Sequence, residues 1–326
     1  MKKIFVTGGC GYVGSILIPK LLENNYEVTV LDLEIFGNNI SKEKNTVNFI
    51  NGDIRDLDLL KKNLPGHTEI IHLACISNDP SFELNPELGK SINFDSFEPM
   101  VKLAKNVGVK KFIYASSSSV YGVKKEREVH EDMILEPLTD YSKYKAKCED
   151  VLLKYSSKDF ITTIIRPATV CGFSPRQRLD VVVNLLTNLA YYKKQITVFG
   201  GNQLRPNIHI ADMVNAYLTL LNADTNLVNN QIFNAGYENQ TVNDLSVTVK
   251  SIIGDEVEII KKKSDDNRSY HISSDKIIKE LGFKPKHTIK DAIIELKSAF
   301  DKNIFNSTLT NPNYFNIKKM QLIKLK

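Results

Sequence analysis

Tyr141 and Lys145 lie four positions apart and could together move a proton at neutral pH. They fall within residues 139–156, where the pattern predicts a helix, and residues four apart share one face of a helix. A free tyrosine hydroxyl has a pKa of about 10, but a nearby ammonium group stabilises the phenolate and lowers that pKa. Tyr141 is therefore predicted to act as general acid and base between an alcohol and a ketone. The same spacing also fits an exposed helix face.

A run of four serines, Ser116 to Ser119, supplies the second candidate group. It begins where an apolar segment over residues 111–116, predicted to be a strand, comes to its end. In an open α/β sheet, ligands bind beyond the carboxyl ends of the strands. A hydroxyl at that edge could hydrogen-bond the reacting oxygen and share its proton with Tyr141. The alternative interpretation is a polar turn that leaves a strand.

Three glycines near the N-terminus, Gly8, Gly11 and Gly14, predict a dinucleotide site. The elements expected around them are a strand over residues 4–6, a helix over 15–22 and a strand over 27–31. The glycines permit a tight turn, a close approach of the pyrophosphate and close packing of the helix, whose first N–H groups face the phosphates. The second strand ends at Asp32, which can accept hydrogen bonds from a ribose diol and would repel a 2′-phosphate. NAD is therefore expected rather than NADP.

Strands and helices alternate along the first half of the chain, which predicts an α/β fold with a doubly wound parallel sheet, a Rossmann fold. Further strands are expected over residues 47–50, 70–74, 111–116, 161–166 and 196–199, and helices over 86–107, 139–156 and 178–193. The alternation weakens after Gly172, which indicates a smaller mixed lobe over the cleft. The predicted division is an NAD-binding domain over 1–172 with added segments near 208–235, a substrate-binding lobe over 173–300 and a C-terminal extension over 301–326. The composition of that extension fits an ordered strap as well as a loose tail.

The composition is that of an ordinary globular protein. The chain has 326 residues, 42% of them hydrophobic and 25% charged, which is enough for a sizeable core. Much of the net charge of +5 lies in basic runs at 261–263 and 317–326 without interleaved aromatic residues, so neither nucleic acid nor a membrane is expected as a partner. The four cysteines form no C-x-x-C pair, so reduced thiols and no metal site are expected. No leader or transmembrane segment is recognisable, which predicts a cytoplasmic protein.

Together these motifs resemble those of the extended short-chain dehydrogenase/reductases, specifically the NAD-dependent nucleotide-sugar epimerase/dehydratase family. The family's P-x-x-x-Y-x-x-x-K falls on Pro137, Tyr141 and Lys145. Its catalytic Ser or Thr, four residues before the Tyr of V-Y-G, falls on Ser117. The resemblance implies that Ser117, Tyr141 and Lys145 are catalytic, that NAD is the cofactor and that a nucleotide-sugar is the substrate.

The resemblance also implies which residues bind the ligands. The cofactor contacts are Gly8, Gly11, Tyr12, Val13, Gly14, Asp32, Asp53, Ile54, Leu73, Ala74, Cys75, Asn93, Tyr141 and Lys145. The candidate substrate contacts are Ser117, Ser118, Thr169, Arg176, Arg178 and Arg205. Arg205 opens a segment that resembles the family's R-x-F-I-H-V-x-D, whose Arg holds the nucleotide-sugar phosphates. Arg176 and Arg178 could contact phosphate or carboxylate, or could equally be exposed cations at a helix start. His72 and His209 fit structural positions of the family, so neither is expected to be catalytic.

Departures from the family pattern narrow the expected reaction. The sugar 4,6-dehydratases follow the catalytic Thr with Asp-Glu, whereas Ser118 and Ser119 stand at these positions here. The Glu that the decarboxylases usually have at the second position is also missing. An NAD-dependent nucleotide-sugar 4-epimerase is therefore the expected activity. In many members of the family an Asn that often contacts the sugar nucleotide stands where this chain has Thr169. The identity of the sugar is therefore left open.

The same resemblance leaves two alternative functions open and implies an oligomeric state. A nucleotide-sugar 4-ketoreductase or dehydrogenase would have the same core residues. A non-catalytic nucleotide-binding or RNA-associated member of the fold is a more remote alternative, which intact Ser117, Tyr141 and Lys145 disfavour. The resemblance also implies a homodimer formed through the predicted helices over 86–107 and 139–156.

Overall fold

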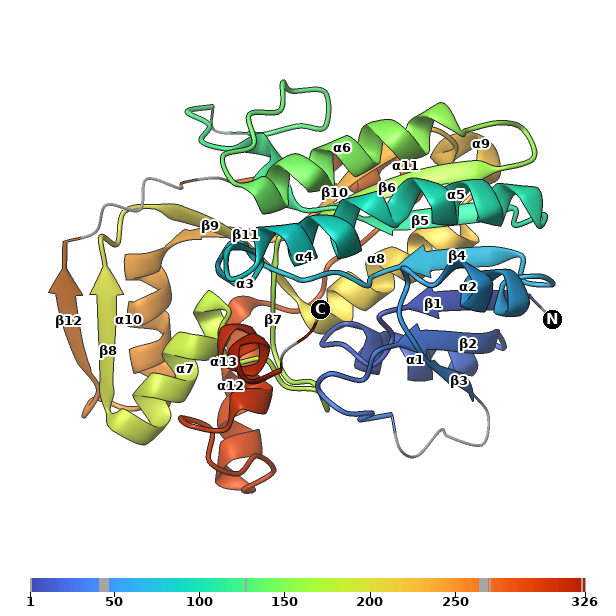
Figure 1. Cartoon of the computed structure of the whole chain (residues 1–326). Helices are drawn as coiled ribbons and strands as arrows, with labels where there is room; N and C mark the ends of the chain where they lie inside the picture. Colours follow the sequence, from blue (N-terminus) through green and yellow to red (C-terminus); the bar gives the residue numbers. More distant parts are fainter. Residues whose placement is uncertain are drawn as a thin grey trace.

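A parallel sheet of seven strands forms the centre of the larger domain (Figure 1), in the order β3-β2-β1-β4-β5-β6-β10. The computed structural model describes residues 2–40, 47–126, 128–263, 269, 271–323 and 325; Lys324 and Lys326 of the basic C-terminal run lie outside the described residues. The strands are β1 (Lys3–Thr7), β2 (Glu27–Asp32), β3 (Val47–Asn51), β4 (Glu69–His72), β5 (Lys111–Ala115), β6 (Ile161–Pro167) and β10 (Gln231–Ala235). All neighbouring strands in this sheet run parallel.

The strand order places the ligand site. The order reverses between β1 and β4, and ligands of such sheets bind beyond the carboxyl ends of the strands at this point. The predicted doubly wound parallel fold is confirmed. The seventh strand, β10, comes from the segment near residues 208–235 that was expected to join the larger domain, whereas the boundary at residue 172 stays a prediction.

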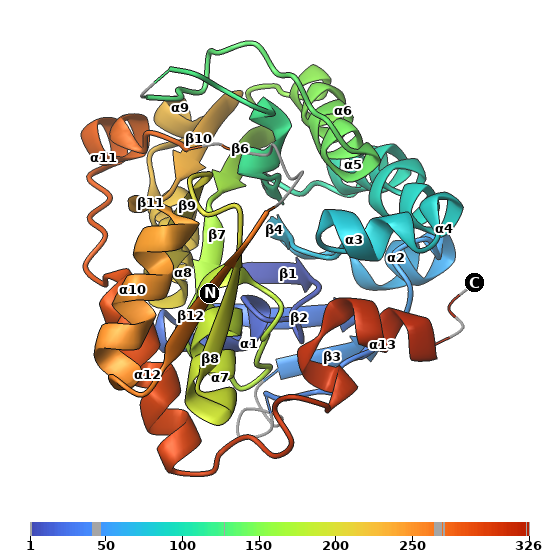
Figure 2. The same ribbon diagram turned by 90° about the vertical axis from the view of Figure 1, so that its left-hand side faces the viewer.

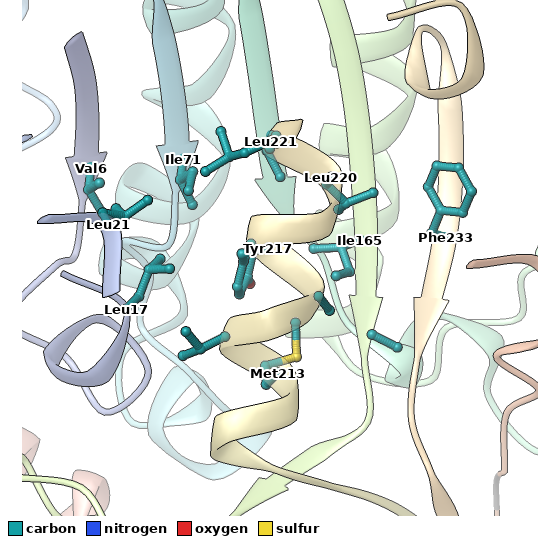
Figure 3. Packing of buried hydrophobic residues seen from close by; sticks show 14 of the residues in the cluster. Val6, Leu17, Leu21, Ile71, Ile165, Met213, Tyr217, Leu220, Leu221 and Phe233 are labelled. Carbon is teal, nitrogen blue, oxygen red and sulfur yellow. The ribbon is translucent and has the colours of Figure 1, made fainter. Parts of the chain in front are cut away.

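Helices cover both faces of the sheet and form two separate cores. One face carries α1 (Gly14–Glu23) and α8 (Ile210–Asn222), and the other carries α2 (Leu57–Asn63), α5 (Phe97–Asn106) and α6 (Asp140–Lys154). Figure 3 shows α8 with Met213, Tyr217 and Leu220 packed toward the strands. Because both faces are covered, the strands are apolar on both sides and lack the alternation of a half-exposed sheet.

The helix predicted over residues 86–107 is divided into three parts. They are α4 (Pro86–Lys90), a π-helical turn η2 (Ser91–Asp95) and α5. Within the wide turn, Asn93 uses its side-chain amide to bond both backbone groups of Ile76, with distances of 2.8 and 3.0 Å. Such a turn depends on a contact distant in sequence, so hydrophobic periodicity cannot reveal it.

Within the described residues, the smaller lobe contains two short sheets and three longer helices. One sheet joins β7 (Thr169–Cys171), β9 (Leu204–His209) and β11 (Glu238–Thr241), and the other joins β8 (Gln195–Phe199) and β12 (Glu258–Lys262). The helices are α7 (Val182–Lys193), α10 (Val242–Ile253) and α12 (Ile289–Asp301); short helices elsewhere are α3 (Asp79–Glu83), α9 (Thr225–Val228) and α11 (Asp275–Leu281). The helix expected from residue 178 begins only at Val182, because Arg178 pairs with Asp180 (Nε to Oδ1, 2.6 Å) in the loop that precedes it.

The C-terminal segment returns from the smaller lobe to the larger domain. After α12 it forms a short 3₁₀ turn, η4 (Pro312–Tyr314), and then α13 (Asn316–Leu322), which packs against α3 (Figure 2). The segment is thus an ordered strap rather than a loose tail. Among the described residues, none of the helices combines the length and the apolar character needed to cross a membrane. All four cysteines are free thiols.

The core under α8 gives a direct test of the fold. Leu220 is completely buried, and Leu220→Ala should lower the free energy of unfolding by about 2–5 kcal/mol, because a large-to-small change leaves a cavity. Leu227→Ala is the matched control, since this leucine is 47% exposed and its truncation should cost less than half as much. Urea unfolding of both variants measures the difference, and equal losses would contradict the packing described.

Candidate active site

A cavity of about 380 Å³ lies at the carboxyl edge of the sheet, between the larger domain and the smaller lobe. Its wall is built from the turn after β1, the loops after β2, β3, β4 and β5, the start of α6, residues 167–181 and the C-terminal segment. The candidate residues that line it are Gly8, Gly11, Tyr12, Val13, Gly14, Asp32, Asp53, Ile54, Leu73, Ala74, Cys75, Ser117, Ser118, Tyr141, Lys145, Thr169, Arg176 and Arg178. Groups far apart in the sequence therefore meet at the edge where the sheet topology places a ligand.

The glycine turn after β1 leaves space that any side chain would fill. Gly8 has a φ of +74°, and a Cβ at this position would lie 2.6 Å from the backbone nitrogen of Ala74. At Gly14 a Cβ would overlap the carbonyl group of Gly9. No side chain caps the start of α1, which suits a helix whose first turn faces a phosphate. The turn thus fits the pyrophosphate of a dinucleotide.

Asp32 lies at the end of β2 with its carboxylate held by the backbone. Oδ2 accepts the N–H of Cys10 at 2.9 Å and Oδ1 accepts the N–H of Glu34 at 2.7 Å. Burial raises the pKa of Asp32 above its usual value, while these two N–H groups oppose that shift. A carboxylate has about four acceptor positions, so positions remain for a ribose diol.

Tyr141 lies in the first turn of α6, where a capping box fixes the start of the helix. The Thr139 hydroxyl accepts the N–H of Ser142 at 3.2 Å, and the Ser142 hydroxyl accepts the N–H of Thr139 at 3.1 Å. Tyr141 is 9% exposed, and the Ser117 hydroxyl lies near enough to lower the pKa of its phenol. Ser117 in turn caps a 3₁₀ turn, η3 (Ser118–Tyr121), which directs its hydroxyl toward the cavity wall.

Lys145 lies one turn beyond Tyr141 and is buried. Its Nζ donates to the carbonyl oxygen of Ala115 at 2.7 Å and lies 5.8 Å from the centre of the Tyr141 ring. The ammonium group is thus tied to the end of β5, beside the serine turn. This contact links α6 to the strand that precedes Ser117.

The pKa of Tyr141 departs from the prediction. Burial raises the pKa of this phenol well above its usual value, and the nearby Cys75 and Asp79 raise it further. Arg178 and the hydrogen bond from Ser117 oppose the shift without reversing it. The predicted lowering is therefore wrong for the protein without its cofactor, because loss of hydration outweighs the nearby cations.

A fully buried ion pair holds α6 to the sheet. Glu149, two turns beyond Tyr141 on α6, accepts Nη2 of Arg166 at 2.6 Å and Nε at 3.0 Å, and both side chains are 3% exposed. The hydroxyl of Ser116 also donates to Glu149. Arg166 donates through Nη1 to the hydroxyl of Tyr121 at 2.7 Å. One network therefore joins α6, the end of β6 and both sides of the serine turn.

The two histidines that were expected to be structural are held in place by neighbours. His72 is buried, its Nδ1 lies 2.7 Å from the Thr7 hydroxyl, and burial lowers its pKa to about 3. His209 accepts the N–H of Ala211 at the start of α8 and lies 3.0 Å from a Glu295 oxygen. Neither lines the cavity.

Two predicted ligand contacts do not line the cavity. Both polar atoms of the Asn93 amide bond to the backbone of Ile76, so this side chain holds the loop after β4 instead of facing a cofactor. Arg205 lies on β9 in the smaller lobe, where its Nη1 donates to the carbonyl oxygen of Leu204 at 2.9 Å. In both cases the motif matched, but the fold directs the side chain elsewhere.

Arg176 and Arg178 both line the cavity, so the alternative of exposed cations at a helix start is wrong. Arg178 donates to Asp180 and, through Nη1, to the Ser77 hydroxyl at 3.3 Å. Arg176 is 4% exposed and stacks on the Phe36 ring, with its guanidinium carbon 3.6 Å from the ring centre. Arg176 thus lies toward the side of the cavity that Asp32 occupies.

Several lining residues were missed by sequence reasoning. Among them are Phe36, Asp79, Asn316, Met320 and Leu325. Phe36 follows Asp32 closely in the chain, so its place in the loop after β2 is a signal that could have found it. The three C-terminal residues have no such local signal, since only the fold brings them back to the cavity.

With this geometry in place, comparison with known proteins defines the class. The family model of the NAD dependent epimerase/dehydratase family matches residues 4–236. The chain belongs to this family, as the sequence motifs indicated, and the family's cofactor is NAD.

The individual relatives have several different activities. A Methanocaldococcus jannaschii protein named "Putative UDP-glucose 4-epimerase" is 32% identical over 301 residues, which cover 89% of this chain and 95% of that protein. A mouse dTDP-D-glucose 4,6-dehydratase is 28% identical over 94% of this chain and 90% of its own length. The crystal structure of the Thermotoga maritima UDP-glucose 4-epimerase with UDP-glucose superposes with a TM-score of 0.82 at 25% identity, over 93% of this chain and all of that one. Similarity alone therefore does not select one reaction.

The glycine turn gives a test of cofactor binding. Gly8→Ala should weaken NAD binding at least tenfold, because the added Cβ overlaps the backbone at Ala74 and the positive φ is strained. Gly66→Ala is the matched control, since Gly66 also has a positive φ (+86°) but has nothing within 4 Å of the added carbon. Isothermal calorimetry measures both affinities. A twofold or smaller change at Gly8 would contradict the assignment of the turn.

Proposed function

We propose that this protein is an NAD-dependent nucleotide-sugar epimerase, most simply a 4-epimerase. The observation that supports this proposal is the composition of the turn beside Tyr141. Ser117 lines the cavity with Tyr141 and lowers its pKa, and the next two residues in the cavity wall, Ser118 and Ser119, carry hydroxyl groups instead of carboxylates. The cavity then holds groups for one reversible proton transfer and lacks the acid and base pair expected in this turn for elimination of water.

The carboxylate that most affects Tyr141 does not replace that pair. Asp79 lines the cavity and raises the pKa of Tyr141, but it accepts a hydrogen bond from the Thr139 hydroxyl at the start of α6. We therefore assign Asp79 to holding the catalytic helix. This assignment keeps dehydration disfavoured, although a dehydratase is among the relatives.

The chain's own residues divide the proposed work. Tyr141 takes the proton of the sugar hydroxyl and later returns it to the same oxygen. Ser117 donates a hydrogen bond that stabilises the phenolate. Lys145 holds α6 against the end of β5 through its bond to the carbonyl oxygen of Ala115. When bound, NAD would accept the hydride of the sugar carbon and would give it back to the opposite face of the keto-sugar. The buried wall excludes water from the keto-sugar while it rotates in the cavity to present its other face.

The substrate contacts and the assembly belong to the same proposal. Thr169 and Arg178 line the cavity near the catalytic groups, and Arg178 could contact a phosphate or a carboxylate of the substrate. The Thermotoga relative was crystallised with UDP-glucose, which makes UDP-sugars the first compounds to test. A homodimer through α5 and α6 is proposed from the family resemblance, and a cytoplasmic location stays a prediction.

Incubation of the purified protein with UDP-, dTDP- and GDP-sugars, without added NADH, tests the reaction. We expect interconversion of 4-epimers, detected by chromatography, because the cofactor is regenerated in each turnover. Turnover that strictly requires stoichiometric NADH would overturn the proposal in favour of a 4-ketoreductase or dehydrogenase. Formation of a 4-keto-6-deoxy-sugar would instead favour a dehydratase.

Tyr141→Phe tests the proposed proton transfer. The variant should lose at least a factor of about 10² in turnover, since general acid–base catalysis typically contributes that much, while NAD affinity changes little. Tyr144→Phe is the control on the same helix, because Tyr144 does not line the cavity. Comparable turnover of the two variants would reject Tyr141 as the catalytic acid and base.

A further inference from the structure

The C-terminal strap is fastened to the cavity wall by a ring of hydrogen bonds around Asn316, which is 5% exposed. Asn316 accepts Nη2 of Arg176 at 2.7 Å, donates through Nδ2 to the Ser77 hydroxyl at 2.8 Å, and donates its backbone N–H to Asp180 at 2.6 Å. Arg178 closes the ring, since it donates to both Ser77 and Asp180. The ring joins three separate segments: the loop after β4, the loop after β7 and the start of α13.

The guanidinium of Arg176 provides a second observation that points to a ligand. Its Nε and Nη1 atoms are buried and have no hydrogen-bond partner in the described part of the chain. Burial and the neighbouring Arg178 lower the pKa of Arg176 to about 9, while the charge of Asp32 opposes that shift. Two unpaired donors in a cavity wall suit a ligand rich in hydroxyl or phosphate oxygens. The predicted substrate contact of Arg176 stays a prediction; its stacking on Phe36, in the loop that follows Asp32, is the observation from which we assign its free donors to the cofactor.

The far end of the strap adds an apolar part to the same wall. Met320 and Leu325 line the cavity and pack against the core that contains Ile54 and Ile92, two further lining residues. Figure 2 shows α13 beside α3, on the side of the larger domain and away from α10 and α12. The strap therefore covers the cavity with the hydrogen bonds of Asn316 at its start and with apolar side chains at its end.

We propose that Asn316 locks the strap over the bound dinucleotide, so that NAD leaves only after this ring opens. The value of such a lock rests on the proposed function: an epimerase reuses one cofactor molecule in every turnover, whereas a ketoreductase must exchange it each time. A slow release of NAD is therefore a property that suits the epimerase. Asn316 acts here by holding Arg176 and the strap, which makes it a positioning residue.

The rate of NAD release tests this proposal directly. Protein loaded with radiolabelled NAD is mixed with excess unlabelled NAD, and the label retained is followed by rapid filtration, with no sugar nucleotide present. Asn316→Ala should speed release at least tenfold, because it removes the contacts to Arg176 and Ser77. Asn313→Ala is the matched control on the same strap, since Asn313 is exposed and bonds only within the strap. Its release rate should stay within twofold of the parent protein.

A second variant covers the case in which Asn316→Ala fails to fold, which thermal unfolding would show. Ser77→Ala removes the acceptor shared by Asn316 and Arg178 from outside the strap and should also speed release several-fold. If Asn316→Ala folds, NAD release at the same rate as from Asn313→Ala would overturn the proposal. If Asn316→Ala does not fold, the same result for Ser77→Ala would overturn it. Because no sugar is present, this result is independent of epimerase activity, and a failed epimerase assay would leave the release rates interpretable.

Discussion

The arrangement of the site depends on the buried ion pair between Glu149 and Arg166. Both side chains are 3% exposed, and the desolvation of two charges at this depth is costly, so the pair is weak evidence for stability as such. What the pair does is fix position. Glu149 belongs to the helix of Tyr141, and Arg166 lies next to the end of β6. The hydroxyl of Ser116, one residue before Ser117, also donates to the Glu149 carboxylate. Loss of either partner would leave a buried charge unpaired and would release the serine turn from the helix.

Burial also sets the protonation of the groups around the cavity. It raises the pKa of the Tyr141 phenol and lowers the pKa of His72 to about 3 and that of Arg176 to about 9. Each shift favours the uncharged form, because an apolar surrounding penalises charge whatever its sign. For the proposed proton transfer, positive charge from a bound ligand would help Arg178 to oppose the raised pKa of Tyr141. This requirement couples the chemistry to an occupied and closed cavity.

The sequence allowed most of the fold to be predicted, because its signals are local. The glycine turn, the apolar strands and the Thr139 cap each depend on residues within a few positions of one another. Contacts between distant segments could not be predicted in this way. Asn93 matched a motif yet bonds to Ile76, and the π-helical turn that holds it has no periodic signature. Asn316 reaches the cavity from the last residues of the chain, where composition fitted a tail as well as a strap.

The serine turn shows how one scaffold can be limited to one reaction. Ser118 is 3% exposed and lines the cavity near Tyr141. A carboxylate at this position would be a second buried acid beside the phenol, and a like charge would raise the pKa of Tyr141 still further. A hydroxyl adds no charge and so leaves the pKa of Tyr141, the proposed acid and base, without this further increase. The side chains at two positions of this turn can thus distinguish two reactions. Epimerisation moves one proton back and forth, whereas dehydration also needs an acid and a base that eliminate water.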